Sequence, residues 1–270
     1  MNKSLLSTLI LLGLAPVFSQ AEEAPAHNIP GDARDPHQYS NGFTRHSGPY
    51  VLHGTHPLML ADEHKLWSVL ADRLEYEPDD ERGAFDISAW YGTTFNRLQI
   101  NLEGELADGN LEHSQTDLLW NHGISTFHDT LLGVRLDSQH EGAERQWLAA
   151  GVQGLLPYWI EYRLMGYVGD DSRSAISLSL EHELLFTQRL GLASRVETSA
   201  YGKDDAETGT GSGFSDLSAG IRLRYDLSRR FGPYAGIDWS KSFGTTARYL
   251  READEPVTDT HYLLGLRFWF

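Results

Sequence analysis

The densest group of possible metal ligands lies in one short stretch of the N-terminal part of the chain. His53, His56 and Met59 follow one another at intervals of three residues, and His64 comes shortly after them. Imidazole nitrogens and thioether sulfur atoms are ligands that copper accepts. The spacing therefore predicts a segment that captures copper ions. A flexible polar tail without a metal role is an equally good interpretation of the same residues.

Three further candidate ligands lie far apart in the rest of the chain. They are His113, Met165 and His261, each in or beside a segment whose pattern predicts a strand. An isolated histidine in a strand is more often a hydrogen-bonded residue than a metal ligand. The sequence shows no serine nucleophile elbow, no phosphate-binding loop and no HExxH zinc motif. We therefore expect a protein that is not an enzyme.

Acidic side chains recur at alternate positions of several segments. In residues 98–105, leucine and isoleucine alternate with glutamine, asparagine and glutamate. The same alternation places these carboxylates on one face of the predicted sheet: Glu103, Glu105, Asp117, Glu161, Glu181, Glu183, Glu197, Asp226 and Asp238. If that face lines a lumen, the acids form a path that attracts cations. The competing interpretation is that most of them form ion pairs with inward arginines and fill the interior.

The last thirteen residues, Thr258–Phe270, show which elements must position these side chains. Tyr262, Leu264 and every second residue as far as Phe270 are apolar, and the residues between them form the opposite face. A period of two over this length predicts a β-strand with one apolar face. An open sheet seldom leaves such an edge unpaired, whereas a closed membrane barrel pairs its last strand with its first.

The chain from Leu66 onward divides into segments of about ten residues separated by turn residues. We predict twelve strands: 66–77, 84–93, 96–106, 111–121, 129–138, 144–155, 158–168, 173–185, 189–201, 214–227, 233–243 and 258–270. A helix over Asp62–Leu70 is the alternative for the first of them. Short connections alternate with connections that are mostly longer, which is typical of outer-membrane barrels. An even number of strands places both termini at the periplasmic end. The predicted fold is therefore an all-β, antiparallel, up-and-down transmembrane β-barrel.

A soluble β-sandwich would show the same alternation, with its apolar face as the core. Strand length, the two kinds of loop, the terminal Phe270 and a predicted export signal together favour the barrel. Residues 1–21 are typical of a secretory signal peptide, with Lys3, the apolar run Leu5–Leu14 and the cleavage pattern Ser19–Ala21. Residues 22–65 lack a period, are rich in proline, glycine and histidine, and predict a flexible periplasmic segment. Residues 66–270 form the predicted barrel, and the predicted location is the outer membrane of a Gram-negative cell.

The formal net charge is −16, and the chain contains no cysteine. Nucleic-acid-binding proteins carry basic patches, so the charge argues against a nucleic-acid partner and favours cations. The absence of cysteine excludes thiolate metal sites and fits an exported barrel, which needs no disulfide bonds.

Several motifs together resemble the copper resistance protein B family of outer-membrane proteins. They are AWYGTTFNRLQINLEGE (Ala89–Glu105), GVQGLLPYWIE (Gly151–Glu161), TQRL (Thr187–Leu190), YGKDD (Tyr201–Asp205), GSGFSD (Gly211–Asp216), AGIRLRY (Ala219–Tyr225), FGPYAGIDW (Phe231–Trp239) and LGLRFWF (Leu264–Phe270). The resemblance runs from about Asp62 to Phe270. It implies a barrel that binds copper ions or conducts them across the outer membrane, and a functional partnership with a periplasmic multicopper oxidase. Outer-membrane lipid and the barrel assembly machinery are the other expected partners.

The chain departs from the family at its N-terminal segment, which in many members is rich in methionine and histidine. After Met1, this chain has only Met59 and Met165. Copper capture by imidazole is therefore the better expectation here. Two other functions stay open on the residues alone: an outer-membrane barrel enzyme, such as a protease or a lipid-modifying protein, and a purely structural barrel with a filled lumen.

Overall fold

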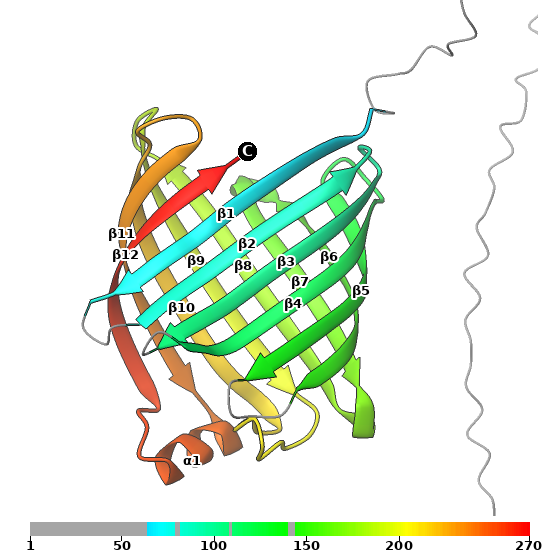
Figure 1. Ribbon diagram of the computed structural model, residues 1–270, viewed down its shortest axis with the longest axis vertical. Coiled ribbons are helices and arrows are strands. Elements are labelled where there is room, and N and C mark those ends of the chain that lie inside the picture. The colour runs from blue at the N-terminus through cyan, green and yellow to red at the C-terminus, as the bar shows by residue number, and fades with distance from the viewer. Residues whose placement is uncertain (1–63, 79–81, 108–109, 140–143) are drawn as a thin grey trace, which may run out of the picture. The chain divides into compact units, whose positions relative to one another are not determined.

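Twelve antiparallel strands form a closed barrel in the computed structural model (Figure 1). The structure describes residues 64–78, 82–107, 110–139 and 144–270. Each strand pairs with its neighbours in the chain, and the last pairs with the first. The strands are β1 (Leu66–Glu77), β2 (Arg82–Gly92), β3 (Asn96–Ala107), β4 (Asn110–Gly123), β5 (His128–Gln139), β6 (Arg145–Leu156), β7 (Ile160–Gly169), β8 (Ser174–Leu185), β9 (Leu190–Tyr201), β10 (Gly213–Tyr225), β11 (Phe231–Ser242) and β12 (Thr258–Trp269). The predicted strand number and fold class are confirmed, and every predicted boundary lies within two residues of the observed one.

The seam between β1 and β12 removes the free edges of the sheet. Leu70 lies opposite Trp269, and Tyr76 lies opposite Leu264. Backbone hydrogen bonds of 2.9 and 3.1 Å join Phe270 to Val69 just beyond the paired part of β12. The closed arrangement leaves no row of unpaired backbone groups, which lipid could not hydrate.

The two faces of the sheet differ in polarity, as the alternation predicts. On β3, Leu98, Ile100 and Leu102 point outward, with exposed fractions of 51, 38 and 37 %. Between them, Gln99 and Asn101 point into the barrel and are 8 and 2 % exposed. Apolar side chains on the outer surface suit contact with lipid hydrocarbon, and polar side chains inside form a lumen.

Two local elements differ from the expectations. The connection predicted as the irregular loop 245–257 contains a helix, α1 (Gly244–Glu252), which Figure 1 shows at the end of the barrel away from the C-terminus. The alternative helix over residues 62–70 is wrong where the structure describes it, because β1 begins at Leu66. Short 3-10 turns, η2 (Pro157–Trp159) and η3 (Asp170–Ser172), join β6 to β7 and β7 to β8.

No helix in the described part of the chain has the length and apolar character needed to cross a membrane.

A β-bulge in β1 breaks the strict alternation. Ala71 pairs with Ile87 and Arg73 pairs with Asp86, so Asp72 is one extra residue on the β1 side. A bulge of this kind re-aims side chains locally. Both Asp72 and Arg73 consequently line the barrel interior, although they are consecutive in sequence.

The interior contains an apolar cluster on one wall. Strands β4 to β7 contribute its buried side chains: Leu119, Leu131, Trp147, Ala149, Met165 and Tyr167. The rings of Trp147 and Tyr167 meet nearly edge to face, with centroids 6.5 Å apart. The lumen is therefore asymmetric, because this buried apolar cluster lies on strands β4 to β7 and not all round the wall.

Candidate ion pathway in the barrel lumen

A cavity of about 1070 Å³ lies inside the barrel. Five of the nine predicted lumen acids line it: Glu103, Glu161, Glu181, Glu183 and Glu197. The other lining residues include serine, asparagine, glutamine and arginine side chains from several strands. The interior therefore combines a polar space with charged walls, which is the arrangement expected of a hydrated path for ions.

Asp117, one of the predicted pathway acids, is held by a bidentate ion pair. Arg135 Nε lies 2.7 Å from Asp117 Oδ1, and Arg135 Nη2 lies 2.8 Å from Oδ2. The Arg135 guanidinium also stacks 4.2 Å from the centre of the Tyr167 ring. The two-point geometry and the low exposure make this pair a fixed part of the wall.

Two arginines of β10 hold four more carboxylates. Arg222 donates to Glu75 of β1 at 2.6 Å and to Asp238 of β11 at 2.6 Å. The hydroxyl of Tyr234 donates to Glu75 at 3.0 Å. These contacts connect three strands and neutralise Asp238, a predicted pathway acid.

Arg224 is the second of these arginines. It donates to Glu183 of β8 at 2.5 Å and to Asp226 at 2.9 Å. For Asp117, Asp226, Asp238 and Glu183, the interpretation as members of an ion-pair network agrees with the observed contacts.

An ion-pair network also crosses the lumen. Asp86 of β2 lies 3.3 Å from Arg73 of β1 and 3.3 Å from Arg195 of β9, both measured at Asp86 Oδ2. Arg195 continues to Glu197, at 3.0 Å. Strands β2 and β9 lie nearly opposite each other in the barrel order. The Asp86–Arg195 contact consequently divides the interior.

Four predicted acids take no part in these networks. Among the ion pairs of the described residues, none involves Glu103, Glu105, Glu161 or Glu181. Glu161 of β7 lies directly opposite Glu181 of β8 in the strand register, and both line the cavity. Like charges opposite each other on neighbouring strands are destabilising. Arg195 of β9 lies opposite Glu181 on its other side and offsets part of this repulsion. A cation between the two glutamates would relieve the remaining repulsion.

The predicted histidine ligands do not converge. His113 Nε2 lies 2.9 Å from Gln115 Nε2. His261 Nδ1 lies 3.6 Å from Glu77, whereas His261 Nε2 lies 3.3 Å from Asp259. Because the two carboxylates approach different ring nitrogens, they do not face one ion together.

The remaining predicted ligands lie either apart from one another or outside the described residues. Met165 is 1 % exposed and packs in the apolar cluster, and His64 is exposed just before β1. His53, His56 and Met59 lie outside the described residues, as do the predicted signal peptide and most of the segment 22–65. In the part of the chain that the structure describes, no group of three or more His, Cys, Asp or Glu side chains is arranged to hold a metal ion.

Asp205 is the centre of an ion-pair group outside the strands, in the connection between β9 and β10. Arg145 donates to both of its oxygens, at 2.9 and 3.1 Å, and Arg173 Nε lies 3.1 Å away. The hydrogen bond from Arg145 lowers the pKa of Asp205 below its ordinary value. The backbone N–H of Ser212 likewise lowers the pKa of Asp204. These contacts fix the β9–β10 connection to the barrel at its α1 end.

Four further members of the lumen network were not among the predicted site residues: Asp72, Arg73, Glu75 and Asp86. Asp86 lay at an inward position of a predicted strand, so its alternation was a usable signal. Arg73 shares a face with Glu75 by alternation, whereas Asp72 lines the interior as well because of the bulge, which strict alternation does not anticipate.

Comparison with known proteins gives one consistent family. Residues 65–270 match the family model described as copper resistance protein B precursor (CopB). A copper resistance protein B homolog of Pseudomonas syringae pv. tomato (strain ATCC BAA-871 / DC3000) is 37 % identical over 203 residues, which cover 74 % of this chain and 69 % of the relative. Copper resistance protein B of Escherichia coli is 35 % identical over 204 residues, covering 75 and 69 %.

The solved structure of the NanC porin shares the fold at low sequence identity. The NanC porin has a TM-score of 0.50 at 8 % identity, covering 75 % of this chain and 99 % of that chain. The KdgM porin has a TM-score of 0.45 at 12 % identity, with the same two coverages.

Proposed function

Because the chain belongs to the copper resistance protein B family, we propose that its barrel conducts copper ions along the carboxylates of its lumen. The chain is an outer-membrane β-barrel with a role in copper resistance. The route through the lumen is the new part of the proposal. It is supported by the Glu161–Glu181 pair, which lines the cavity without an ion-pair partner among the described residues.

The chemistry of the pathway favours copper(II) over copper(I). Carboxylate oxygens and imidazole nitrogens suit copper(II), whereas copper(I) prefers thiolate and thioether sulfur. The methionine of the barrel, Met165, is buried among apolar side chains. Glu161 and Glu181 therefore offer oxygen ligands that bind weakly enough for an ion to leave, which conduction requires.

The test is copper(II) flux into liposomes that contain the refolded protein and an internal copper-sensitive dye. Replacing both acids, in Glu161→Gln with Glu181→Gln, removes the negative charge and keeps the side-chain shape. We expect copper flux to fall by about tenfold, which corresponds to about 1.4 kcal/mol in the barrier. The matched control replaces two exposed glutamates near α1, Glu252→Gln with Glu255→Gln, and should leave flux unchanged. Equal flux in the two double variants would contradict the pathway.

The segment 22–65 is proposed to capture copper before it enters the barrel. His53, His56, Met59 and His64 are its candidate ligands, with His113 and His261 as candidates inside the barrel. Copper content of the refolded protein with and without residues 22–65 tests this. Most of the bound copper should disappear with the segment, and unchanged copper content would exclude it as the capture site.

A periplasmic multicopper oxidase is the proposed functional partner, at the end of the barrel that carries the termini. The barrel assembly machinery is the proposed partner during insertion into outer-membrane lipid. Cross-linking from a residue introduced near Leu66, at the end of the barrel where β1 begins and β12 ends, would capture the oxidase if it exchanges copper there. Cross-linking only from the α1 end would contradict copper exchange at the end that carries the termini.

We propose that the chain is not an enzyme, in preference to a protease or a lipid-modifying role. The motifs of those chemistries are missing from the sequence. Turnover of any substrate in a panel of lipids and peptides would contradict the proposal that the chain is not an enzyme. A purely structural barrel is the other alternative, and the absence of single-channel conductance would favour it.

A further inference from the structure

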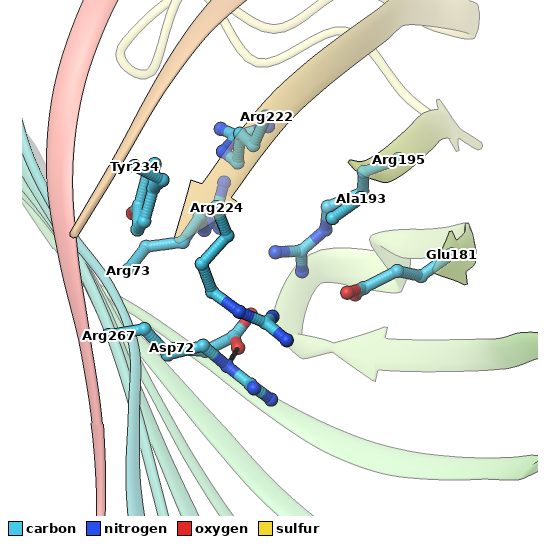
Figure 2. A pocket seen from close by; sticks show the side chains of 9 residues that line it. All are labelled: Asp72, Arg73, Glu181, Ala193, Arg195, Arg222, Arg224, Tyr234 and Arg267. Atoms are coloured by element: carbon cyan, nitrogen blue, oxygen red, sulfur yellow. Dashed lines mark hydrogen bonds and ion pairs between the residues drawn. The ribbon is translucent and has the colours of Figure 1, made fainter. Parts of the chain in front are cut away.

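A second, smaller space in the lumen has a different character from the cavity described above. It has a volume of about 30 Å³ and is lined by Asp72, Arg73, Glu181, Ala193, Arg195, Arg222, Arg224, Tyr234 and Arg267. Figure 2 shows these side chains converging on it from several strands. Five guanidinium groups and two carboxylates therefore surround a space that is large enough for one or two water molecules.

Three of the five arginines have their charge matched by close carboxylates. Arg267 Nε lies 2.7 Å from Asp72, and the two arginines of β10 hold acids at 2.5 to 3.1 Å. These short contacts are of the length expected for charge-assisted hydrogen bonds. They account for Arg222, Arg224 and Arg267.

Arg73 and Arg195 are different, because they share one carboxylate oxygen. Both approach Asp86 Oδ2, and each contact is 3.3 Å long. Arg73 forms no other ion pair in the described part of the chain. The Nε–H groups of both Arg73 and Arg195 are buried and donate to no acceptor among the described residues. Arg195 also lies 3.0 Å from Glu197. What the two arginines share is a buried Nε–H donor without an acceptor, which is costly.

We propose that this space is a binding site for a small inorganic anion of halide size, held by Arg73 and Arg195. An anion there would accept from the two Nε–H groups of Arg73 and Arg195 that have no acceptor among the described residues. The size of the space excludes bulky organic anions. The site goes beyond the proposed copper pathway. It shares the lining residue Glu181 with that pathway, but its ligand has the opposite charge and its test contains no copper.

The site has a consequence for selectivity. The lumen of a strongly acidic protein would then hold an arginine-lined space, so a cation and its counter-ion would meet binding groups of both signs along one path. The overall charge of −16 gives no indication of this.

The experiment is a chloride titration of the refolded full chain in neutral detergent, followed by the excess line width of the ³⁵Cl NMR signal. Gluconate, which is too large for the space, keeps the ionic strength constant. We expect saturable broadening for the natural sequence. Arg195→Gln and Arg73→Gln, made separately, should each weaken chloride binding by about tenfold, the effect of losing one charge-assisted hydrogen bond. Each single variant leaves Asp86 one arginine partner, so the barrel should still close.

The matched control is Arg163→Gln, because Arg163 faces the larger cavity and does not line the small space. It should bind chloride as the natural sequence does. Broadening that does not saturate would overturn the proposal, and so would an equal loss of binding in Arg163→Gln and Arg195→Gln. A lower mobility of the unheated protein on a denaturing gel would identify any variant that fails to fold. If one arginine variant fails, the other decides the outcome.

Discussion

Asp86 of β2 and Arg195 of β9 lie 109 positions apart in the chain, and their side chains meet inside the barrel at 3.3 Å. The contact joins strands that are five neighbours apart around one side of the barrel and seven around the other. The contact links the two spaces of the lumen. Both residues line the larger cavity. Arg195 also lines the arginine-lined space together with Arg73, the second partner of Asp86.

Asp86→Asn should destabilise the barrel strongly. The substitution leaves the Arg73 and Arg195 guanidinium groups without their shared carboxylate in a buried region. Removing one partner of a buried ion pair costs about 3–5 kcal/mol. Unfolding by urea in detergent measures the difference. Asp170→Asn is the matched control, because Asp170 is 74 % exposed in its pair with Arg173, and exposed pairs contribute at most about 1 kcal/mol. Similar unfolding midpoints for the two variants would show that the Asp86 carboxylate does not stabilise the barrel.

The strands could be predicted from sequence because a membrane barrel imposes one simple rule on every strand. Lipid contact requires an apolar residue at every second position, and the short turns supply clear boundaries. Phe268 and Phe270, for instance, identified the last strand before any pairing was known. The helix α1 was missed because it lies in a long polar connection, where no such rule operates.

The lumen contacts could not be predicted from sequence to the same degree. Alternation indicates that Glu75 and Arg222 both face inward, but not that they meet at 2.6 Å. Their contact depends on the closure of the sheet and on the stagger of its strands, which no local pattern specifies. The bulge in β1 adds a second difficulty, because it places the consecutive residues Asp72 and Arg73 both inside the barrel.

Gly265→Ala should destabilise the seam, because a methyl group at this position would collide with the Tyr234 ring. A Cβ atom on Gly265 would lie 2.3 Å from a ring carbon of Tyr234, whose hydroxyl also donates to Glu75. Overpacking of this kind costs about 1–3 kcal/mol. The control is Gly166→Ala on β7, where the nearest atom to the added carbon lies 3.7 Å away. Thermal unfolding of the two variants should differ, and equal melting temperatures would show that the Tyr234 ring moves aside freely.

Acidification should release the connection between β9 and β10. The pKa of Asp205 is lowered in the folded protein by the hydrogen bond from Arg145. Its stabilising contribution is therefore complete above the unfolded pKa of about 3.9 and is lost as the pH falls through the lower, folded value. The protection factors of residues 203–212, which correct for the much lower intrinsic exchange rate in acid, should thus be high at neutral pH and lower near pH 3. Asp205→Asn should give fast exchange at neutral pH, whereas Asp171→Asn, an exposed neighbour of Arg173, should not. Slow exchange in Asp205→Asn would show that Arg145 and Arg173 do not fix this connection.

Deletion of Phe270 should impair closure of the barrel. The backbone N–H of Phe270 donates to Val69 at 2.9 Å, and its carbonyl accepts from the Val69 N–H and the Ser68 hydroxyl, each at 3.1 Å. Loss of the residue removes all three hydrogen bonds from the seam, together with an apolar side chain that is 59 % exposed on the outer surface. The measurement is the fraction of protein that reaches the outer membrane and runs as a folded band on an unheated gel. Phe270→Leu separates the two contributions, because it keeps the backbone pairing and removes only the aromatic ring. We expect the deletion to reduce assembly more than Phe270→Leu does, with copper content per folded molecule unchanged in both. Normal assembly of the truncated chain would show that β12 closes against β1 without its last residue.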